Sequence, residues 1–520
     1  MAQAGAYDRT KKSIRNSIVA VSLQVVSLLI GFWSRRIFLN HLGTEVLGLN
    51  TTANSLLQFL NLAEMGIGGA IGVTLYKPLF ENDRKTIREV VALNGWLYKR
   101  IALIVIAGSI ILFFFFPSIF TKMELPMWYA YASFGVLLYG ALLGYFVNYK
   151  QVLLSADQKE YKLQFSFKLV SIFKLVAEAF AIKYLEHGFY WWLGLEFVFS
   201  TISAIALTRT VNKEYPYLKE KVHNTNSLHK RYPDVTKKIK QILFQKIGGF
   251  VLGQSSPLFI YAFASLTMVS LYGNYTLLTV NLAALLTALF NGLNGSIGNM
   301  VAEGNKNLIM KVFRELFSSR FLIVGVCCIC LWILTEPFLI LWIGEGYLLN
   351  KTTLALVILL FFLGQIRSTV DSFCYAYGIF WDIWAPLTEA AINIVLSIIL
   401  GRHYGLNGIL TGVAVSQLIM IYGWRPVLLF HWGLKESIGY YLKIFGKHLL
   451  LFAISFGIIF FVNKSITLPQ IDNFGIFFFY AVAIFLSSSI VLGGLLYVSE
   501  SGIRTFIGRI KCIIMPKSQA

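Results

Sequence analysis

Charged residues are scarce in this chain. Of its 520 residues only 13% are charged and 57% are hydrophobic, with a mean hydropathy of +0.68, whereas soluble domains carry about 25% charged residues. Apolar runs of about 20 residues, each long enough to cross a ~30 Å hydrocarbon core, recur along the whole chain. The composition therefore excludes a soluble protein and predicts a polytopic membrane protein. The net charge of +20 is interpreted as basic loops that meet anionic membrane lipids, and not as a nucleic-acid surface.

Recognisable catalytic and cofactor motifs are also missing. No GxxxxGK[ST] loop suggests direct use of ATP, HExxH is absent, and no Asp-rich cluster suggests a metal-dependent glycosyltransferase. No repeated pore filter suggests a channel. The five cysteines are odd in number, and four of them lie in apolar segments without the histidines that a metal site would need. We expect no enzyme activity, no metal and no cofactor. The cysteines are Cys327, Cys328, Cys330, Cys374 and Cys512.

Apolar length, proline and glycine breaks, and charged flanks together predict about fourteen transmembrane helices. Lys and Arg gather before the first span, after the second and fourth spans and after the last span, so both termini are expected to be cytoplasmic. The N-terminus shows no small-residue cleavage site and is interpreted as leading into a retained span. The predicted spans cover residues 14–38, 46–76, 92–117, 127–150, 163–185, 190–211, 241–264, 269–299, 316–342, 352–379, 385–404, 406–430, 440–463 and 474–498.

The two halves of the chain resemble each other. At a constant offset, Gly66, Gly69 and Gly72 fall on Gly292, Gly295 and Gly298, and "LFNGLNGSIG" repeats the first cluster. Six helices separate each equivalent pair, so the copies share one orientation, and the fold class is an all-α membrane protein of two six-helix bundles related by a pseudo-two-fold along the membrane normal, plus two C-terminal helices. The predicted parts are the first bundle at 1–211, a basic cytoplasmic linker at 212–240, the second bundle at 241–431, accessory helices at 432–498 and a cytoplasmic tail at 499–520.

The glycine cluster itself is open to two interpretations. A dinucleotide-binding fingerprint is excluded, because no strand precedes it and its third glycine is displaced. Small residues one turn apart instead favour a seam where a neighbouring helix approaches closely. Such a seam either only packs or also lets two bundles move against each other.

Ionisable residues inside the spans are candidates for function, because a charge in hydrocarbon is costly and faces a partner or a cavity. Two pairs at i,i+4 spacing, Lys174 with Glu178 and Arg367 with Asp371, are predicted near the middle of the membrane. They either neutralise each other or line a hydrophilic cavity. Arg425 and Lys168 are expected to reach the cytoplasmic interface.

Two further sets of ionisable residues also have two possible interpretations each. Arg35 and Arg36 lie deep in the first span, where they either reach the outer interface or face a cavity. Glu64, in the inner leaflet, is either paired with a Lys or Arg on the cytoplasmic side or functional. The duplication places Phe290 where a second copy of Glu64 would fall.

The stretch 35–71 resembles the start of the Wzx-type polysaccharide flippases. A first-helix arginine, an LGxExxGL turn and an LAExGIGxA helix follow in that order, and here they read LGTEVLGL at 42–49 and LAEMGIGGA at 62–70. The resemblance implies the multidrug/oligosaccharidyl-lipid/polysaccharide exporter (MATE-like) superfamily, with two bundles whose first, second, seventh and eighth helices line a cavity. It also implies alternating access.

For function, the resemblance implies translocation of undecaprenyl-diphosphate-linked oligosaccharide repeat units from the cytoplasmic to the periplasmic leaflet of a bacterial inner membrane, for O-antigen, lipopolysaccharide or capsule synthesis. Polymerase and chain-length proteins of that pathway would be further partners, and the last two helices would hold the prenyl tail. In this scheme Arg35, Arg36, Lys174 and Arg367 meet the diphosphate, while Glu64, Glu178 and Asp371 couple ions or hold those cations. A MATE-like cation-coupled antiporter and a membrane-embedded polymerase or ligase of lipid-linked sugars are the rival interpretations.

Overall fold

The structure, a computed structural model, describes residues 2–64, 66–157, 159–219, 228, 231–291, 294–379, 381–382, 384–465 and 471–514. Within these ranges it contains helices and no strand, which confirms the all-α prediction. The main helices are α1 (Ala2–Leu60), α2 (Ile67–Phe80), α3 (Arg84–Ile119), α4 (Trp128–Phe146), α5 (Gln151–Ala156), α6 (Glu160–Tyr184), α7 (Gly188–Glu214), α9 (Pro233–Phe263), α10 (Leu266–Asn291), α11 (Asn294–Glu303), α12 (Lys306–Ile343), α13 (Lys351–Ala376), α14 (Trp384–Gln417), α15 (Arg425–Leu428), α16 (Ile438–Ser465), α17 (Phe474–Ser499) and α18 (Ser501–Ile514).

The chain is a multi-pass membrane protein. Nine helical segments in the described part are long and apolar enough to cross a membrane, and one of them, residues 384–434, contains two of the predicted spans. Those two spans are joined at Gly405, whose backbone is not helical (φ 54°, ψ −131°). The first two predicted spans likewise meet inside α1 at Gly43 (φ 84°, ψ 171°), because only glycine enters such conformations at little cost.

The second predicted span, 46–76, is not one helix. It consists of the end of α1, a 3₁₀ turn η1 (Asn61–Glu64) and α2, and Gly66 between the last two has φ of 128°. A Cβ atom at Gly66 would lie 2.7 Å from the Ile239 carbonyl oxygen and 3.1 Å from the Leu243 nitrogen, both in α9. The break therefore follows from the close approach of a distant helix. The eighth predicted span is also built from two helices, α10 and α11.

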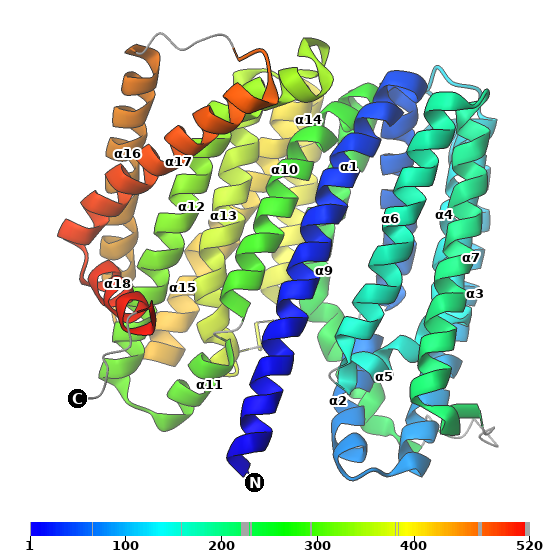
Figure 1. Cartoon of the computed structure of the whole chain (residues 1–520), viewed down its shortest axis with the longest axis horizontal. Coiled ribbons are helices and arrows are strands. Elements are labelled where there is room, and N and C mark those ends of the chain that lie inside the picture. Colours follow the sequence, from blue (N-terminus) through cyan, green and yellow to red (C-terminus); the bar gives the residue numbers. More distant parts are fainter. Residues whose placement is uncertain are drawn as a thin grey trace. The chain divides into compact units, whose positions relative to one another are not determined.

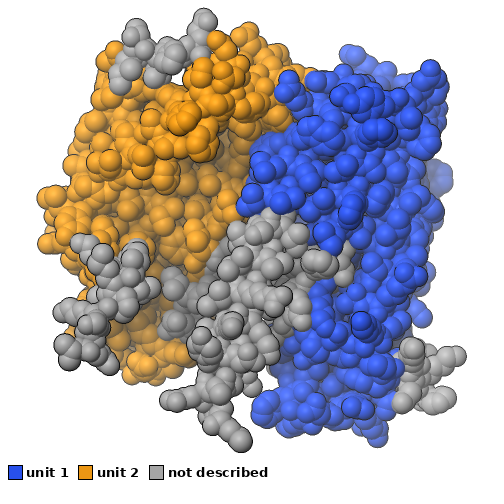
Figure 2. Space-filling view, viewed as in Figure 1, with its two compact units in different colours: residues 1–270 blue, residues 271–520 orange. Residues whose placement is uncertain are grey.

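The chain folds into two compact units, unit 1 at residues 1–270 and unit 2 at residues 271–520 (Figure 2). Unit 1 includes α9, which packs against α1 and α2, although the predicted boundary at the 212–240 linker assigns this helix to the second half. The linker end is fixed to unit 1 as well: Arg231 Nη1 and the Tyr232 hydroxyl donate to the two oxygens of Glu89 in α3, at 2.9 and 2.8 Å. The division by sequence duplication stays a prediction.

Unit 2 is built around α12. This helix packs against α13 and α17, and in Figure 1 α12 and α13 run side by side. Phenylalanines at 313, 317, 321, 373 and 430 fill the core between them. The accessory helix α16 is fixed to α12 by a 3.0 Å hydrogen bond between His448 Nε2 and the Ser318 hydroxyl.

The predicted tail at 499–520 begins with a helix. α18 packs on α12 so closely that a Cβ at Gly502 would lie 2.7 Å from the Arg314 carbonyl oxygen. Ile503 in its first turn is fully buried against α12, α16 and α17. The first turn of this segment is thus part of the unit 2 core.

Candidate functional site

Unit 1 holds an ion pair deep within its helices. Lys174 Nζ in α6 lies 2.7 Å from Glu196 Oε1 in α7. Lys174 precedes the end of α6 by ten residues and Glu196 follows the start of α7 by eight, so both lie about 12–15 Å from the connecting loop. The predicted partner, Glu178, is therefore not the ion-pair partner seen here. The signal for Glu196 was available in the sequence, as an acid at the matching depth of the next, antiparallel span.

Glu178 is buried beside this pair. Only 4% of the residue is exposed, and in the described part of the chain its Oε1 has no hydrogen-bond partner. It lies one turn from Lys174 on α6, so the lysine charge is close without forming a direct pair. The cluster is one cation and two carboxylates, with one carboxylate not fully satisfied.

The two arginines of the first span have different environments. Arg35 is half-buried and Arg36 is exposed. The next turn of α1 packs on α6 and α7: Phe38 meets Trp192 edge to face, with ring centroids 6.2 Å apart, and both belong to one buried cluster with Ala179. Arg35 thus lies one turn from the contact between α1 and the helices that carry the Lys174 pair. Arg36 does not join it.

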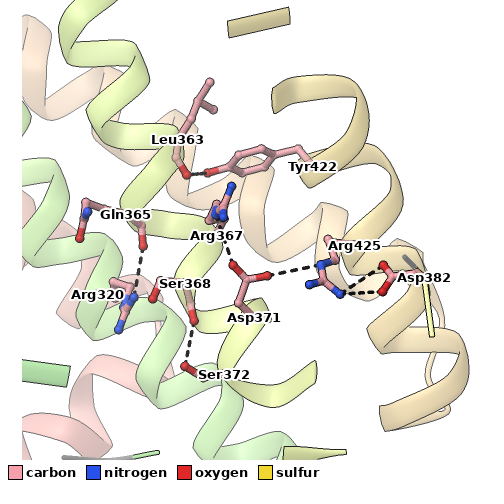
Figure 3. A network of polar contacts seen from close by, with 10 residues as sticks. All are labelled: Arg320, Leu363, Gln365, Arg367, Ser368, Asp371, Ser372, Asp382, Tyr422 and Arg425. Carbon is pink, nitrogen blue, oxygen red and sulfur yellow. Dashed lines mark hydrogen bonds and ion pairs between the residues drawn. The ribbon is translucent and has the colours of Figure 1, made fainter. Parts of the chain in front are cut away.

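Unit 2 contains a chain of four charged side chains (Figure 3). Arg367 Nε lies 3.2 Å from Asp371 Oδ2, so the predicted i,i+4 pair forms on α13. Arg425 continues the chain: it lies 3.5 Å from Asp371 through Nε and 3.2 Å from Asp382 through Nη1. Arg425 thus joins this network, and its expected position at the cytoplasmic interface stays a prediction. It directly follows a π-helical segment, η5 (Leu418–Trp424), a type of helix distortion that is frequent at functional sites.

Two more charged residues border this network. Arg320 in α12 is 7% exposed, donates to the Gln365 carbonyl at 3.3 Å and stands 4.1 Å above the Phe290 ring. Glu389 in α14 is also 7% exposed, and its Oε1 lacks a hydrogen-bond partner among the described residues. Sequence reasoning missed both. The predicted span 316–342 has Arg320 near its start, whereas α12 begins ten residues earlier, at Lys306.

Glu64 lies in the 3₁₀ turn before the break at Gly66. The partner seen in the structure is a tyrosine: the Tyr98 hydroxyl of α3 donates to Glu64 Oε1 at 2.9 Å. One turn away, the Tyr145 hydroxyl donates to Asn61 Oδ1 at 2.7 Å, and the two tyrosine rings are 5.8 Å apart. Hydroxyl groups from α3 and α4 thus hold the 3₁₀ turn in place.

The glycines of the predicted seam differ in how closely other residues approach them. Gly66 meets the α9 backbone directly, Gly72 makes ordinary contact with Val152, Gly69 is exposed, and Gly298 has open space around it. Gly295 lies in α11, and Gly292 lies outside the described residues. The seam as a whole, including its role in movement, stays a prediction.

These features define a class: a multi-pass membrane protein with networks of opposite charges held inside its helices. No protein-family model matches the chain, and no curated protein matches it in sequence. Solved structures do match. The inward-closed lipid II flippase MurJ aligns over 93% of this chain and 99% of its own, with a TM-score of 0.65 and 16% identity. An inward-facing multidrug resistance MATE family transporter of the MOP superfamily aligns over 78% of this chain and 96% of its own, with a TM-score of 0.57 and 14% identity. The chain shares the fold of these two proteins.

Proposed function

We propose that this chain is an alternating-access flippase that moves undecaprenyl-diphosphate-linked oligosaccharide repeat units from the cytoplasmic to the periplasmic leaflet of a bacterial inner membrane, with both termini in the cytoplasm. The observation that carries the proposal is the charged network of unit 2. Arg367 uses its Nε for Asp371, and 32% of its side chain is exposed, so its guanidinium remains accessible to a ligand.

A diphosphate needs cations along its path through an apolar slab, because an unpaired charge in hydrocarbon is costly. Guanidinium groups bind phosphate oxygens with two parallel hydrogen bonds, which favours arginine for this task. Unit 2 offers Arg367, flanked by Arg320 and Arg425, and unit 1 offers Arg35 and Lys174. The fold shared with a lipid II flippase supports a lipid-linked substrate of the same kind.

Carboxylates in the same helices are candidates for coupling transport to an ion gradient. Asp371 is shared by Arg367 and Arg425, so its charge helps to hold both arginines. Glu178 and Glu389 are buried and each has an oxygen without a partner in the described part of the chain. Their charged forms are costly there, which suits groups that take up a proton or an ion during the cycle.

Two rival functions predict different behaviour. A cation-coupled drug antiporter, supported by the similarity in fold to a MATE transporter, would use an acidic site and tolerate loss of Arg367. A polymerase or ligase would form a new glycosidic bond, whereas a flippase leaves the repeat unit unchanged.

The proposal is tested in proteoliposomes that contain a fluorescent undecaprenyl-diphosphate oligosaccharide, with a membrane-impermeant reagent that reports the leaflet. Arg367→Gln is expected to slow translocation at least about tenfold, because a charge-assisted hydrogen bond contributes roughly 1.5–3 kcal/mol. Arg402→Gln, an exposed arginine in α14, is the matched control and keeps the wild-type rate. Equal rates for all three proteins would refute the assigned site, and a wild-type rate no faster than empty vesicles would refute the function.

A further inference from the structure

A cavity of about 200 Å³ lies in unit 1, away from the charged residues considered above. It forms where α4 ends at Phe146 and the chain turns through the 3₁₀ segment η2 (Asn148–Lys150) into α5. The opposite wall is the last part of α7, where it is lined by Leu207, Thr208 and Val211. Phe146 at its rim is 44% exposed, so the cavity is open to the surface of the unit.

The cavity wall contains an unsatisfied polar group. Asn148 is 9% exposed, and its Oδ1 has no hydrogen-bond partner among the described residues. Buried polar atoms are nearly always paired, so an unpaired acceptor in a residue that lines a cavity indicates a missing donor. A single water needs only about 10–15 Å³ of such space, so the volume admits a larger molecule.

A cationic residue lines the same cavity as Asn148. Lys150 also lines the cavity, and its Nζ lies 5.8 Å from the centroid of the Tyr149 ring. In the described part of the chain no carboxylate lies within ion-pair distance of this ammonium. Three charged groups that follow along the chain, at 157, 159 and 162, are engaged with one another and with Glu214. The site thus offers one free positive charge and one free acceptor.

The depth of the cavity identifies the kind of ligand. Leu207 and Val211 precede the end of α7 by seven and three residues, or about 5–10 Å. That end carries Glu214 with its lysine partners, a charged cluster typical of the membrane–water interface. The positive loop residues place it on the cytoplasmic side, where anionic lipids attract basic groups. Lipid head groups lie at this level.

We infer that this cavity binds the head group of an anionic glycerophospholipid. Lys150 pairs with the lipid phosphate, and a head-group hydroxyl donates to Asn148 Oδ1. Phosphatidylglycerol satisfies both requirements. Phosphatidylcholine has the same phosphate but no N–H or O–H donor in its head group, so it satisfies one only. The site is independent of the transported substrate.

The test is native mass spectrometry of the full chain in detergent with phosphatidylglycerol or phosphatidylcholine added. Phosphatidylglycerol is expected to give a 1:1 adduct with at least fivefold higher affinity than phosphatidylcholine. Lys150→Gln should weaken the phosphatidylglycerol adduct at least fivefold. Lys213→Gln, which removes an exposed lysine near the same end of α7, should leave it unchanged.

A second variant separates binding from folding. Asn148→Leu is expected to reduce phosphatidylglycerol affinity to that of phosphatidylcholine without lowering the melting temperature in phosphatidylcholine, because the open acceptor contributes no bond to the fold. Equal losses for Lys150→Gln and Lys213→Gln would show general electrostatic attraction and overturn the assignment. Displacement of the adduct by inorganic phosphate alone would show a free-phosphate site and overturn the lipid assignment.

Discussion

The ion pair between Lys174 and Glu196 joins α6 to α7 well inside the helices. Removing one partner of such a pair leaves the other charge buried and unpaired, whereas replacing both by apolar residues is often neutral for stability. Lys174→Met is therefore expected to lower the free energy of unfolding by about 3 kcal/mol, and Lys174→Met with Glu196→Leu to restore most of it. Thermal unfolding in detergent measures both.

Translocation by the double variant separates structure from function. If Lys174 meets the substrate diphosphate, the double variant folds like the wild type but transports at least about tenfold more slowly. Normal transport by this stable protein would mean that the pair is structural only.

Gly66 and Gly298 both belong to the predicted glycine seam but differ in their surroundings. A Cβ atom added at Gly66 would lie 2.7 Å from the α9 backbone, and Gly66 has a φ of 128°. Gly66→Ala is therefore expected to lower the free energy of unfolding by about 1–3 kcal/mol through backbone strain alone. At Gly298 nothing lies within 4 Å, so Gly298→Ala should stabilise α11 by about 0.5–1 kcal/mol. Melting temperatures that shift in opposite directions confirm this. Equal shifts would contradict a close approach at Gly66.

At the scale of elements, apolar length and charged flanks predict where helices lie, but not where a helix is interrupted or which other helices it contacts. Arg367 and Asp371 pair on one helix as their i,i+4 spacing predicts. Lys174 and Glu178 have the same spacing on α6, but Lys174 pairs with Glu196 of the next helix, α7. Gly66 interrupts its span where α9 passes close to it. The last two outcomes depend on contacts between helices, which the periodicity of one segment does not report.

The contact between the linker end and α3 is one such element. Burial, and then the hydrogen bond to Glu89, raise the pKa of Tyr232 to about 12. Because the folded-state pKa is raised, this contact stabilises fully below pH 10 and is lost as the pH rises through about 12. Glu89→Gln removes the ion pair to Arg231 and is expected to increase hydrogen exchange of residues 231–240 at least about tenfold, corresponding to some 1.4 kcal/mol.

An exposed carboxylate outside this contact supplies the control. Glu81 lies 3.8 Å from Lys77, and 52% of its side chain is exposed. Surface ion pairs of this kind contribute little to stability, so Glu81→Gln should leave the hydrogen exchange of residues 231–240 unchanged. If Glu89→Gln also leaves that exchange unchanged, the linker end is held by other contacts.

At the scale of the whole molecule, nine segments of the described residues are long and apolar enough to cross a membrane, and one of them contains two predicted spans. The other four predicted spans, the first, second, fifth and seventh, belong to unit 1. The second is interrupted at Gly66, and the fifth carries Lys168, Lys174 and Glu178, a number of charges that is costly within one span.

The number of spans determines on which sides of the membrane the two termini lie. The fourteen predicted spans, an even number, place both termini on one side, whereas an odd number would place them on opposite sides. We expect Cys512 in the tail, and a cysteine introduced as Ser13→Cys, to resist a membrane-impermeant maleimide in intact spheroplasts and to react after permeabilisation. Background reaction is controlled in a variant with Cys512 replaced by serine, because the four other cysteines lie in α12 and α13 and are buried or half-buried. Labelling of only one terminus in intact spheroplasts would mean an odd number of spans and would contradict the predicted arrangement of fourteen.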